Sequence, residues 1–326
     1  MREIVSASLG SSKRDHQVEV ELLGEKFNIR RIGMDGDFGK IADLLKDLDG
    51  KVDAIGLGGI DIFLTDGTRQ YAIRDGEKLQ ALVRRTPIVD GSKLKNVLER
   101  ETVRFLVEER DLPLCDKTVL MVSAVDRFGM AEALAAAGCS MIFGDLIFGL
   151  KIPVPIRSIS NFKNIAHMLL PFATKLPFQM LYPVGEEQDK EPESKYRKYY
   201  DEADIIAGDY LYIKRYMPLD MQGKWIITNT ITASDIEDLK ERGVELLVTS
   251  TPEFDGRSFG TNVIEAVLVS LLDKPWEAVG PSEYLGLLKK LDFKPRVIEL
   301  AGGCEIPDAS HEPRDTKHET RQNETR

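Results

Sequence analysis

The pattern of hydrophobic and polar positions predicts alternating strands and helices in the first third of the chain. Short segments rich in β-branched and aromatic side chains predict strands at Glu3–Ser8, Gln17–Leu22, Phe27–Ile32 and Val52–Leu57. Between the last two, hydrophobic residues recur at the spacing of one helical face over Ile41–Leu48. A strand, a helix and a second strand in succession form a βαβ unit, which implies a parallel sheet.

The first domain is expected to end at a proline-containing joint. Helical periodicity at Gly76–Arg85 and Leu94–Arg110 completes a first α/β domain, residues 1–114. We expect this domain to form the substrate side of the protein. After Leu112–Leu114 the pattern restarts with Val119–Ala124, a continuous hydrophobic run typical of a strand buried on both faces. A second core therefore begins beyond this joint.

The remainder predicts a second α/β domain. Further strands are expected at Cys139–Phe143, Phe178–Tyr182, Asp204–Ala207, Trp225–Asn229 and Val244–Thr249. Helices are expected at Met130–Ala137, at Asn262–Leu272 and after a capping box from Ser234 to Glu237. We interpret residues 115–301 as a Rossmann-like domain, with a mostly parallel sheet and helices on both faces.

Composition restricts the class of protein. Of the 326 residues, 42% are hydrophobic, and the three cysteines show no metal-ligand spacing. The formal net charge of −10, without a dense basic patch, argues against nucleic acid or an anionic membrane as partner. The charged loop Gly185–Lys195 is expected to be mobile and residues 302–326 to form a disordered tail. We expect a cytoplasmic protein that binds a small molecule, holds no metal and could form a homo-oligomer.

A turn in the second domain matches part of a dinucleotide-binding motif. Aligning G-x-G-x-x-G to end at Gly129 puts Ala124 and Asp126 at the other two glycine positions. Asp126 would repel a pyrophosphate unless Arg127 compensates for its charge. Asp145 ends the next strand, where an acidic residue can bind the adenosine ribose and favour NAD over NADP. The alternative is that Asp126 caps a helix and Asp145 occupies a turn.

A later pair of strands adds to the cofactor hypothesis. The segments ADIIAGD, WIITNT and ELLVTSTP are similar in pattern to the second half of a dehydrogenase Rossmann domain. Thr249 and Thr251 would then join the cofactor-binding residues at the end of the last of these strands. The same pattern is also compatible with a general α/β unit that binds no nicotinamide.

The loop after the first strand offers several hydrogen-bond donors. Ser8, Gly10, Ser11, Ser12 and Lys13 could hold a carboxylate or a polyol through backbone amides, hydroxyls and a cation. The loop lacks the spacing of a P-loop. An exposed turn would explain the same residue types.

Four segments carry a resemblance to a known family. SLGSSKRDHQVEVELLGEKFNIRRIGMDGDF, GGIDIF, TPIVDGSKLKNVLER and SAVDRFGMAEAL resemble bacterial proteins named quinate 5-dehydrogenase. The resemblance implies oxidation of a ring hydroxyl of quinate to 3-dehydroquinate with NAD or NADP. Related dehydrogenases use a lysine–aspartate pair, which implies that Lys93 with Asp90 takes the hydroxyl proton, and His16 is the rival candidate.

Two functions from different classes follow. The first is an NAD(P)-dependent oxidoreductase that acts on a small hydroxylated carboxylate. The alternative is a non-redox, two-lobed ligand-binding or regulatory protein, or a transferase that binds an anion at the N-terminal loop.

Overall fold

The first residues fold into a sheet of mostly parallel strands. The computed structural model describes residues 1–177, 196–251, 253–254 and 257–300. The five-stranded sheet has the order β2-β3-β1-β4-β7. Its strands are β1 (Arg2–Ser8), β2 (His16–Leu22), β3 (Glu25–Gly33), β4 (Ala54–Gly58) and β7 (Ile88–Val89). Only β2 pairs antiparallel, with β3, so the predicted parallel βαβ unit is confirmed.

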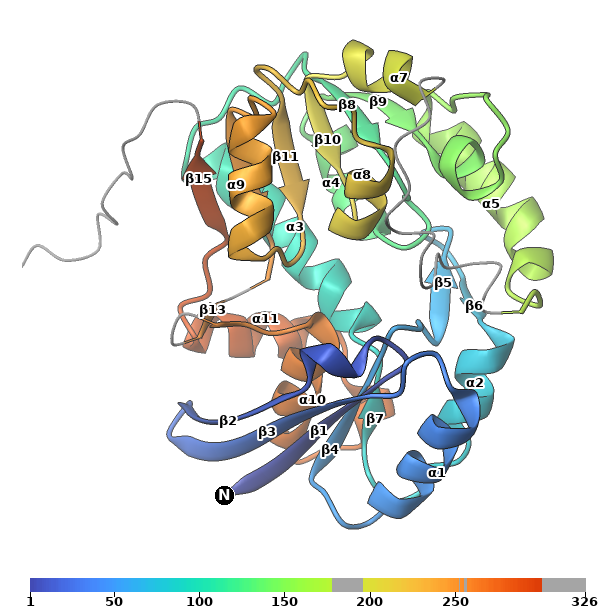
Figure 1. Cartoon of the computed structure of the whole chain (residues 1–326), viewed down its shortest axis with the longest axis vertical. Helices are drawn as coiled ribbons and strands as arrows, with labels where there is room; N and C mark the ends of the chain where they lie inside the picture. Colours follow the sequence, from blue (N-terminus) through green and yellow to red (C-terminus); the bar gives the residue numbers. More distant parts are fainter. Residues whose placement is uncertain (178–195, 252, 255–256, 301–326) are drawn as a thin grey trace, which may run out of the picture.

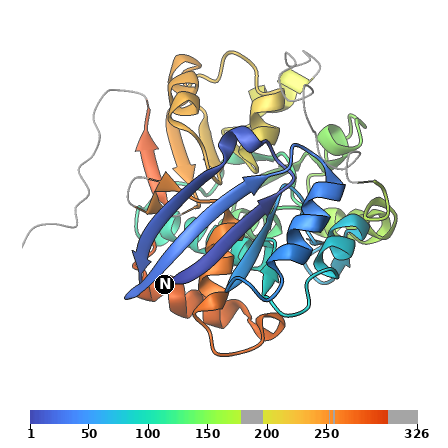
Figure 2. The same ribbon diagram turned by 60° about the horizontal axis from the view of Figure 1, so that its bottom comes forward.

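Helices cover both faces of this sheet (Figure 2). Side chains alternate along a strand, so Ile4 and Val5 of β1 are both fully buried in separate hydrophobic clusters. One face packs against α1 (Phe38–Leu48), which Asp37 caps as predicted, and against α2 (Arg74–Gln80). The other face packs against α3 (Ser92–Glu108), α10 (Thr261–Ser270) and α11 (Pro281–Lys290).

A six-stranded sheet forms the second lobe. Its order is β15-β12-β11-β10-β8-β9, and β15 alone is antiparallel to its neighbour. The strands are β8 (Thr118–Met121), β9 (Ser140–Phe143), β10 (Ile205–Ala207), β11 (Trp225–Thr228), β12 (Leu246–Thr249) and β15 (Arg296–Glu299). The predicted mostly parallel sheet is confirmed. Its parallel strands follow the order 2-1-3-4-5 along the sheet, as in flavodoxin-like folds, and not the order of dinucleotide-binding domains.

Helices also lie on both faces of the second sheet, as predicted (Figure 1). They are α4 (Phe128–Ala136) and α5 (Ile159–Ala173) on one face, and α7 (Arg197–Glu202), α8 (Tyr210–Tyr216) and α9 (Ala233–Glu241) on the other. The capping box of α9 is Thr232 with Asp235, two residues before the predicted one, because the Thr232 hydroxyl accepts the Asp235 amide. Short elements connect these units: η1 (Ser12–Arg14), β5 (Phe63–Thr65), β6 (Gln70–Ala72), η2 (Asp145–Gly149), β13 (Glu253–Phe254), β14 (Arg257–Ser258) and η5 (Trp276–Ala278).

The chain passes between the lobes after β7, after β12 and after α11. The first passage is α3, whose Leu94 and Leu98 pack on the first sheet and whose Val103 and Leu106 belong to a hydrophobic cluster that extends over both lobes. The second passage brings α10 and α11 back to the first sheet, and the third returns β15 to the second sheet. Each lobe is therefore built from segments that are far apart in the sequence.

Several sequence predictions fall outside the described residues. These are the strand Phe178–Tyr182, the loop Gly185–Lys195 and the tail at residues 302–326. Among the helices that the structure does describe, none has the length and apolar character needed to cross a lipid bilayer. The cytoplasmic location stays a prediction.

Replacing Gly91 with alanine should destabilise the junction of α3 with α10. Gly91 has φ of 92°, and an added Cβ would lie 2.6 Å from the Asn262 backbone nitrogen. Gly36 has φ of 82° and open space around it, so Gly36→Ala is a matched control with backbone strain alone. We expect Gly36→Ala to cost about 1–2 kcal/mol of unfolding free energy and Gly91→Ala clearly more, measured by urea denaturation. An equal loss of unfolding free energy in the two variants would show that α10 can move away from an added Cβ at residue 91 without cost.

Candidate functional site

The carboxyl ends of both parallel sheets point toward the boundary between the lobes (Figure 1). Ligands of open α/β sheets bind beyond these strand ends. We call the loops at this boundary the interlobe edge, defined as residues 9–15, 59–62 and 90–91 of the first lobe and 122–127, 144–145, 208–209, 229–231 and 250–251 of the second. The two sides contact each other directly, since the Thr65 amide of β5 donates to the Val125 carbonyl at 3.5 Å.

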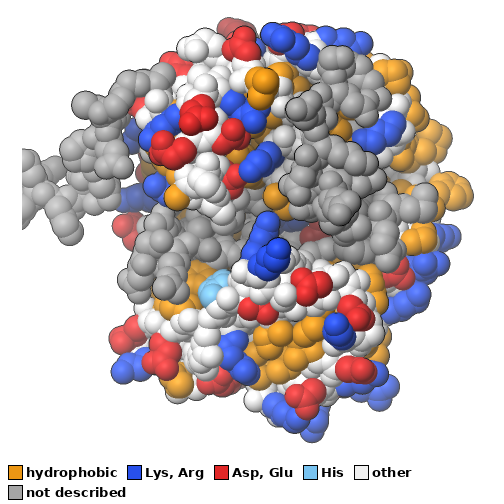
Figure 3. All heavy atoms as spheres, in the orientation of Figure 1, with side chains coloured by type: hydrophobic (Ala, Val, Ile, Leu, Met, Phe, Trp, Pro, Cys, Tyr) orange, Lys and Arg blue, Asp and Glu red, His pale blue; other side chains and the backbone are white. Residues whose placement is uncertain are grey.

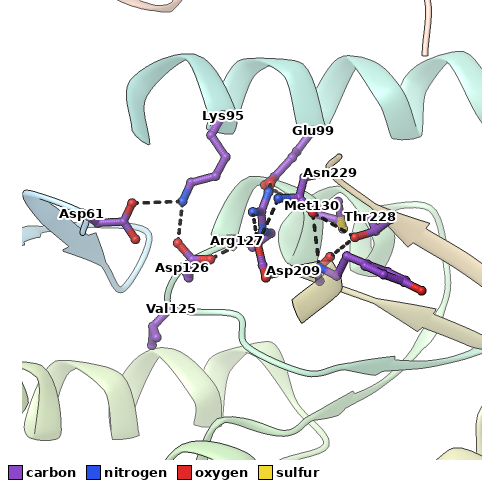
Figure 4. Close-up of polar contacts among 12 residues, drawn as sticks. Asp61, Lys95, Glu99, Val125, Asp126, Arg127, Met130, Asp209, Thr228 and Asn229 are labelled. Carbon is purple, nitrogen blue, oxygen red and sulfur yellow. Dashed lines mark hydrogen bonds and ion pairs between the residues drawn. The ribbon is translucent and has the colours of Figure 1, made fainter. Parts of the chain in front are cut away.

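Lys95 of α3 binds carboxylates from both lobes (Figure 4). Its Nζ donates to Asp126 in the loop after β8, and lies 3.5 Å from Asp61 in the loop after β4. The side chains of Lys95, Asp61 and Asp126 are 9%, 15% and 16% exposed. Because these charges are largely withdrawn from water, each depends on the others for compensation.

Arg127 forms the second half of this network. Its guanidinium lies 2.7 Å from Glu99 Oε1 of α3, 3.0 Å from Asp209 Oδ2 after β10 and 3.5 Å from Asp126 Oδ2. Asn229, after β11, donates to Asp209 at 2.9 Å. Burial raises the pKa of Glu99, although the Arg127 charge opposes that shift. The network joins α3 to three strand ends of the second sheet.

Asp145 closes the loop that the sequence analysis assigned to a cofactor. Its Oδ1 accepts the amides of Ala124 at 2.9 Å and of Val125 at 3.0 Å. Among the described residues, its buried Oδ2 has no hydrogen-bond partner. Burial raises the pKa of Asp145 to about 6, with the Asp126 charge adding to the effect and the two amides opposing it.

The three predicted catalytic residues lie apart. Asp90 accepts the Ile62 amide at 2.6 Å and the Ser92 amide at 2.9 Å. Lys93 donates instead to the backbone carbonyl of Glu277 at 3.1 Å. His16 is exposed, with Nδ1 2.9 Å from the Arg14 carbonyl, on the edge strand β2. The structure therefore describes no Asp90–Lys93 ion pair.

The hydroxyls of the N-terminal loop bind partners within the first lobe. Ser8 Oγ accepts from the Gly10 amide and from Arg31, both at 3.1 Å, and Ser11 Oγ accepts from the Lys13 amide at 3.2 Å. Ser12 donates through its amide and its hydroxyl to Asp35, both at 2.8 Å. Lys13 is exposed. Figure 3, in the orientation of Figure 1, shows a small group of Lys and Arg side chains near the middle of this face.

The other predicted cofactor residues are packed inside the second lobe. An added Cβ at Gly129 would lie 2.6 Å from the Asn96 carbonyl, so this glycine allows α4 to approach α3. Thr249 and Thr251 are buried at the end of β12, and Thr251 Oγ accepts from Thr230 Oγ at 3.1 Å. Asp126 does not cap α4 either, because the N-cap of that helix is Arg127 and has no side-chain bond.

Sequence reasoning missed the residues that hold the network together. The sequence patterns place Lys95 and Glu99 only within a helix and Asn229 only at the end of a strand, and they do not indicate that these side chains belong to one network. A signal was present, because Lys95 and Glu99 are one turn apart on α3 and interrupt a hydrophobic pattern. Charged residues on a buried helical face indicate paired charges, but their partners cannot be read from the sequence.

Comparison with sequence families gives two adjoining matches. Residues 93–300 match the profile of a family described as Domain of unknown function (DUF8754), and residues 3–90 match Domain of unknown function (DUF8753). A search of curated proteins gives no match.

A search of solved structures returns proteins of low identity and low TM-score whose descriptions name a sugar or, in one case, bound allitol. A glucose-galactose binding protein, GanP, from Geobacillus stearothermophilus is 12% identical, with 92% of this chain and 97% of that chain covered and a TM-score of 0.36. A substrate-binding protein of a sugar ABC transport system from Bordetella parapertussis is 10% identical, with 94% and 91% covered and a TM-score of 0.38. An ABC transporter solute-binding protein from Agrobacterium vitis with bound allitol is 11% identical, with 92% and 96% covered and a TM-score of 0.36.

The expected NAD(P)-dependent, quinate 5-dehydrogenase-like oxidoreductase is wrong. The parallel strands of the second sheet do not follow the order found in dinucleotide-binding domains. In addition, Asp145 accepts the amides of Ala124 and Val125, so its carboxylate holds the turn after β8 together. Asp126 also places a carboxylate at the motif position where the backbone must come close to a pyrophosphate. NAD and NADP are therefore withdrawn as cofactors.

Arg127→Met should destabilise the protein strongly. Glu99 is fully buried, so removal of its cation leaves an uncompensated charge, at a cost of about 3–5 kcal/mol. Arg157→Met is the control, because its pair with Glu202 is exposed and should contribute at most about 1 kcal/mol. Adding Glu99→Gln to Arg127→Met should restore part of the loss in urea denaturation. A loss no larger than that of Arg157→Met would contradict the network.

Asp145→Asn should stabilise the protein at neutral pH. The folded pKa of about 6 lies above the ordinary value of 3.8, so the stability that Asp145 contributes is present in acid and is lost as the pH rises to about 6. Asparagine keeps the acceptor for both amides without the charge. We expect no difference below about pH 4 and a gain of about 1–3 kcal/mol above about pH 6. Asp204→Asn, at a carboxylate that accepts the Thr118 amide, is the control and should give no gain.

Proposed function

The chain belongs to the family described as Domain of unknown function (DUF8754), and we propose that it is a non-redox protein of two lobes that binds a small molecule at the interlobe edge. The single observation that carries this proposal is the convergence of strand ends from both sheets on one boundary. A ligand there would contact both lobes, and its binding would favour one relative position of the lobes.

The three chain passages support this function. Each passage is a short segment or a single helix between lobes that have separate sheets. Hinged lobes close around a ligand when a few such connections absorb the motion. The contacts between Lys95 and both Asp61 and Asp126 then describe the lobes in a closed arrangement.

The chemistry of the edge favours a polar ligand with hydroxyl or amino groups. The second lobe has carboxylates and hydroxyls at its strand ends, among them the half-buried Asp145 and Thr230. The first lobe adds the exposed Lys13 in η1. Both cations of the network, Lys95 and Arg127, are already matched by carboxylates. A strongly anionic ligand would therefore be poorly compensated on the second lobe.

Thermal unfolding with panels of neutral polyols, amines and carboxylates tests the proposal. A ligand at about 100 times its Kd adds about 2.7 kcal/mol of stability, so at least one class should raise the Tm. NAD and NADP at the same concentration should leave the Tm unchanged. No rise with any class would contradict the proposed function.

The variant Lys13→Ala tests the role of the first lobe. Its side chain is exposed, so its loss should weaken binding of the ligand found in the panel about 3- to 10-fold, with little change in unfolding free energy. Lys46→Ala, on the exposed face of α1, is the matched control and should bind normally. Isothermal titration of both variants measures the difference, and equal affinities would remove η1 from the site.

A further inference from the structure

Two carboxyl groups from different lobes meet at the interlobe edge. Asp61 belongs to the loop after β4 in the first lobe, and Asp126 to the loop after β8 in the second. Lys95 Nζ contacts both carboxyl groups, so the two acids lie on either side of one ammonium (Figure 4). Two carboxylates held this close repel each other when both are ionised. A proton on one of the two acids relieves that repulsion and stabilises the contact between the lobes.

The surroundings place that proton on Asp61 at neutral pH. Burial raises the pKa of Asp61 to about 8, the charges of Asp126 and Asp90 raise it as well, and Lys95 only partly opposes them. Burial also acts on Asp126, but the charges of Lys95 and Arg127 outweigh it and hold the pKa of Asp126 well below its usual range. The two acids thus differ in protonation although they lie side by side.

Titratable groups from several elements surround the pair, and acids outnumber bases among them. The groups are Asp90 after β7, Lys95 and Glu99 on α3, Arg127 beside Asp126, Asp145 after β9, and Asp209 and Tyr212 at α8. Ionising Asp61 would add another negative charge to this set. Lys95 cannot offset it fully, because the same ammonium already compensates Asp126.

We propose that Asp61 and Asp126 form a proton-dependent clasp between the lobes. The clasp holds the first lobe against the second while one of the two acids is protonated, and it lets the lobes separate when that proton is lost. The clasp goes beyond the proposed function, because it acts on the lobes with or without a ligand. Where a ligand does bind, the clasp sets the pH range in which the closed arrangement is available.

Small-angle scattering of the full chain, without added small molecules, tests the clasp. The radius of gyration should rise as the pH is raised through about 8, because two ionised carboxylates then repel each other across the lobes. Asp61→Asn keeps a neutral hydrogen-bond donor and should stay compact over the same range. Asp126→Asn removes the second carboxylate and should also lose the transition. Asp43→Asn, at an exposed carboxylate of α1, is the control and should behave as the unmodified protein.

Thermal unfolding gives a second readout with a different pH window. The folded pKa of Asp61 is raised, so the stability it contributes is present in acid and is lost steadily as the pH rises from about 4 to about 8. Over this window, the Tm of Asp61→Asn should fall by several degrees less than that of the unmodified protein. The Asp43→Asn profile should be unchanged.

Three results would overturn the clasp. One is a radius of gyration that stays constant through pH 8 in the unmodified protein, and another is the same expansion in Asp61→Asn. The third is a Tm profile of Asp61→Asn that parallels that of the unmodified protein. None of them depends on a ligand, so failure of the clasp and failure of the proposed function are distinguishable.

Discussion

The buried guanidinium of Arg127 is the charge on which the arrangement of the lobes depends. A cation enclosed in this way must keep its carboxylates close, and Glu99, Asp126 and Asp209 reach it from α3, from the loop after β8 and from the turn after β10. Those elements cannot move independently without leaving a charge uncompensated. Arg127 therefore fixes α3 against the second sheet, and α3 in turn determines where the first lobe lies.

Helix α3 transmits this constraint because it belongs to both cores. It packs against α10 and α11, which cover the first sheet, and against α4 of the second lobe. Lys95 and Glu99 lie one turn apart in the first half of α3, where they meet carboxylates and Arg127 at the boundary between the lobes. From there Lys95 reaches the pair of acids Asp61 and Asp126, which places a titratable contact at the edge where a ligand would bind.

The failure of the cofactor hypothesis has a physical explanation. The sequence offered a strand, a turn and a helix with one matching glycine, and an acid at a plausible distance. In the structure, Asp145 satisfies amides of that same turn, and Gly129 serves the close packing of α4 on α3. The residue types that bind a dinucleotide also stabilise a turn through hydrogen bonds within the chain, and spacing in the sequence does not distinguish these two roles.

The sequence by itself determined the local elements, because periodicity and capping act over a few residues. Ile41–Leu48 predicted α1 with its Asp37 cap, and Val119–Ala124 predicted the buried strand β8. Only the tertiary structure decided which charges meet, since Lys95 and Asp126 are separated by most of α3 and the whole of β8, and Asp209 is farther still. It also decided that α10 returns to the first sheet, because a hydrophobic face does not specify which of two cores will bury it. The raised pKa of Asp61 depends on that same assembly, since burial and neighbouring charges arise only when distant segments pack together.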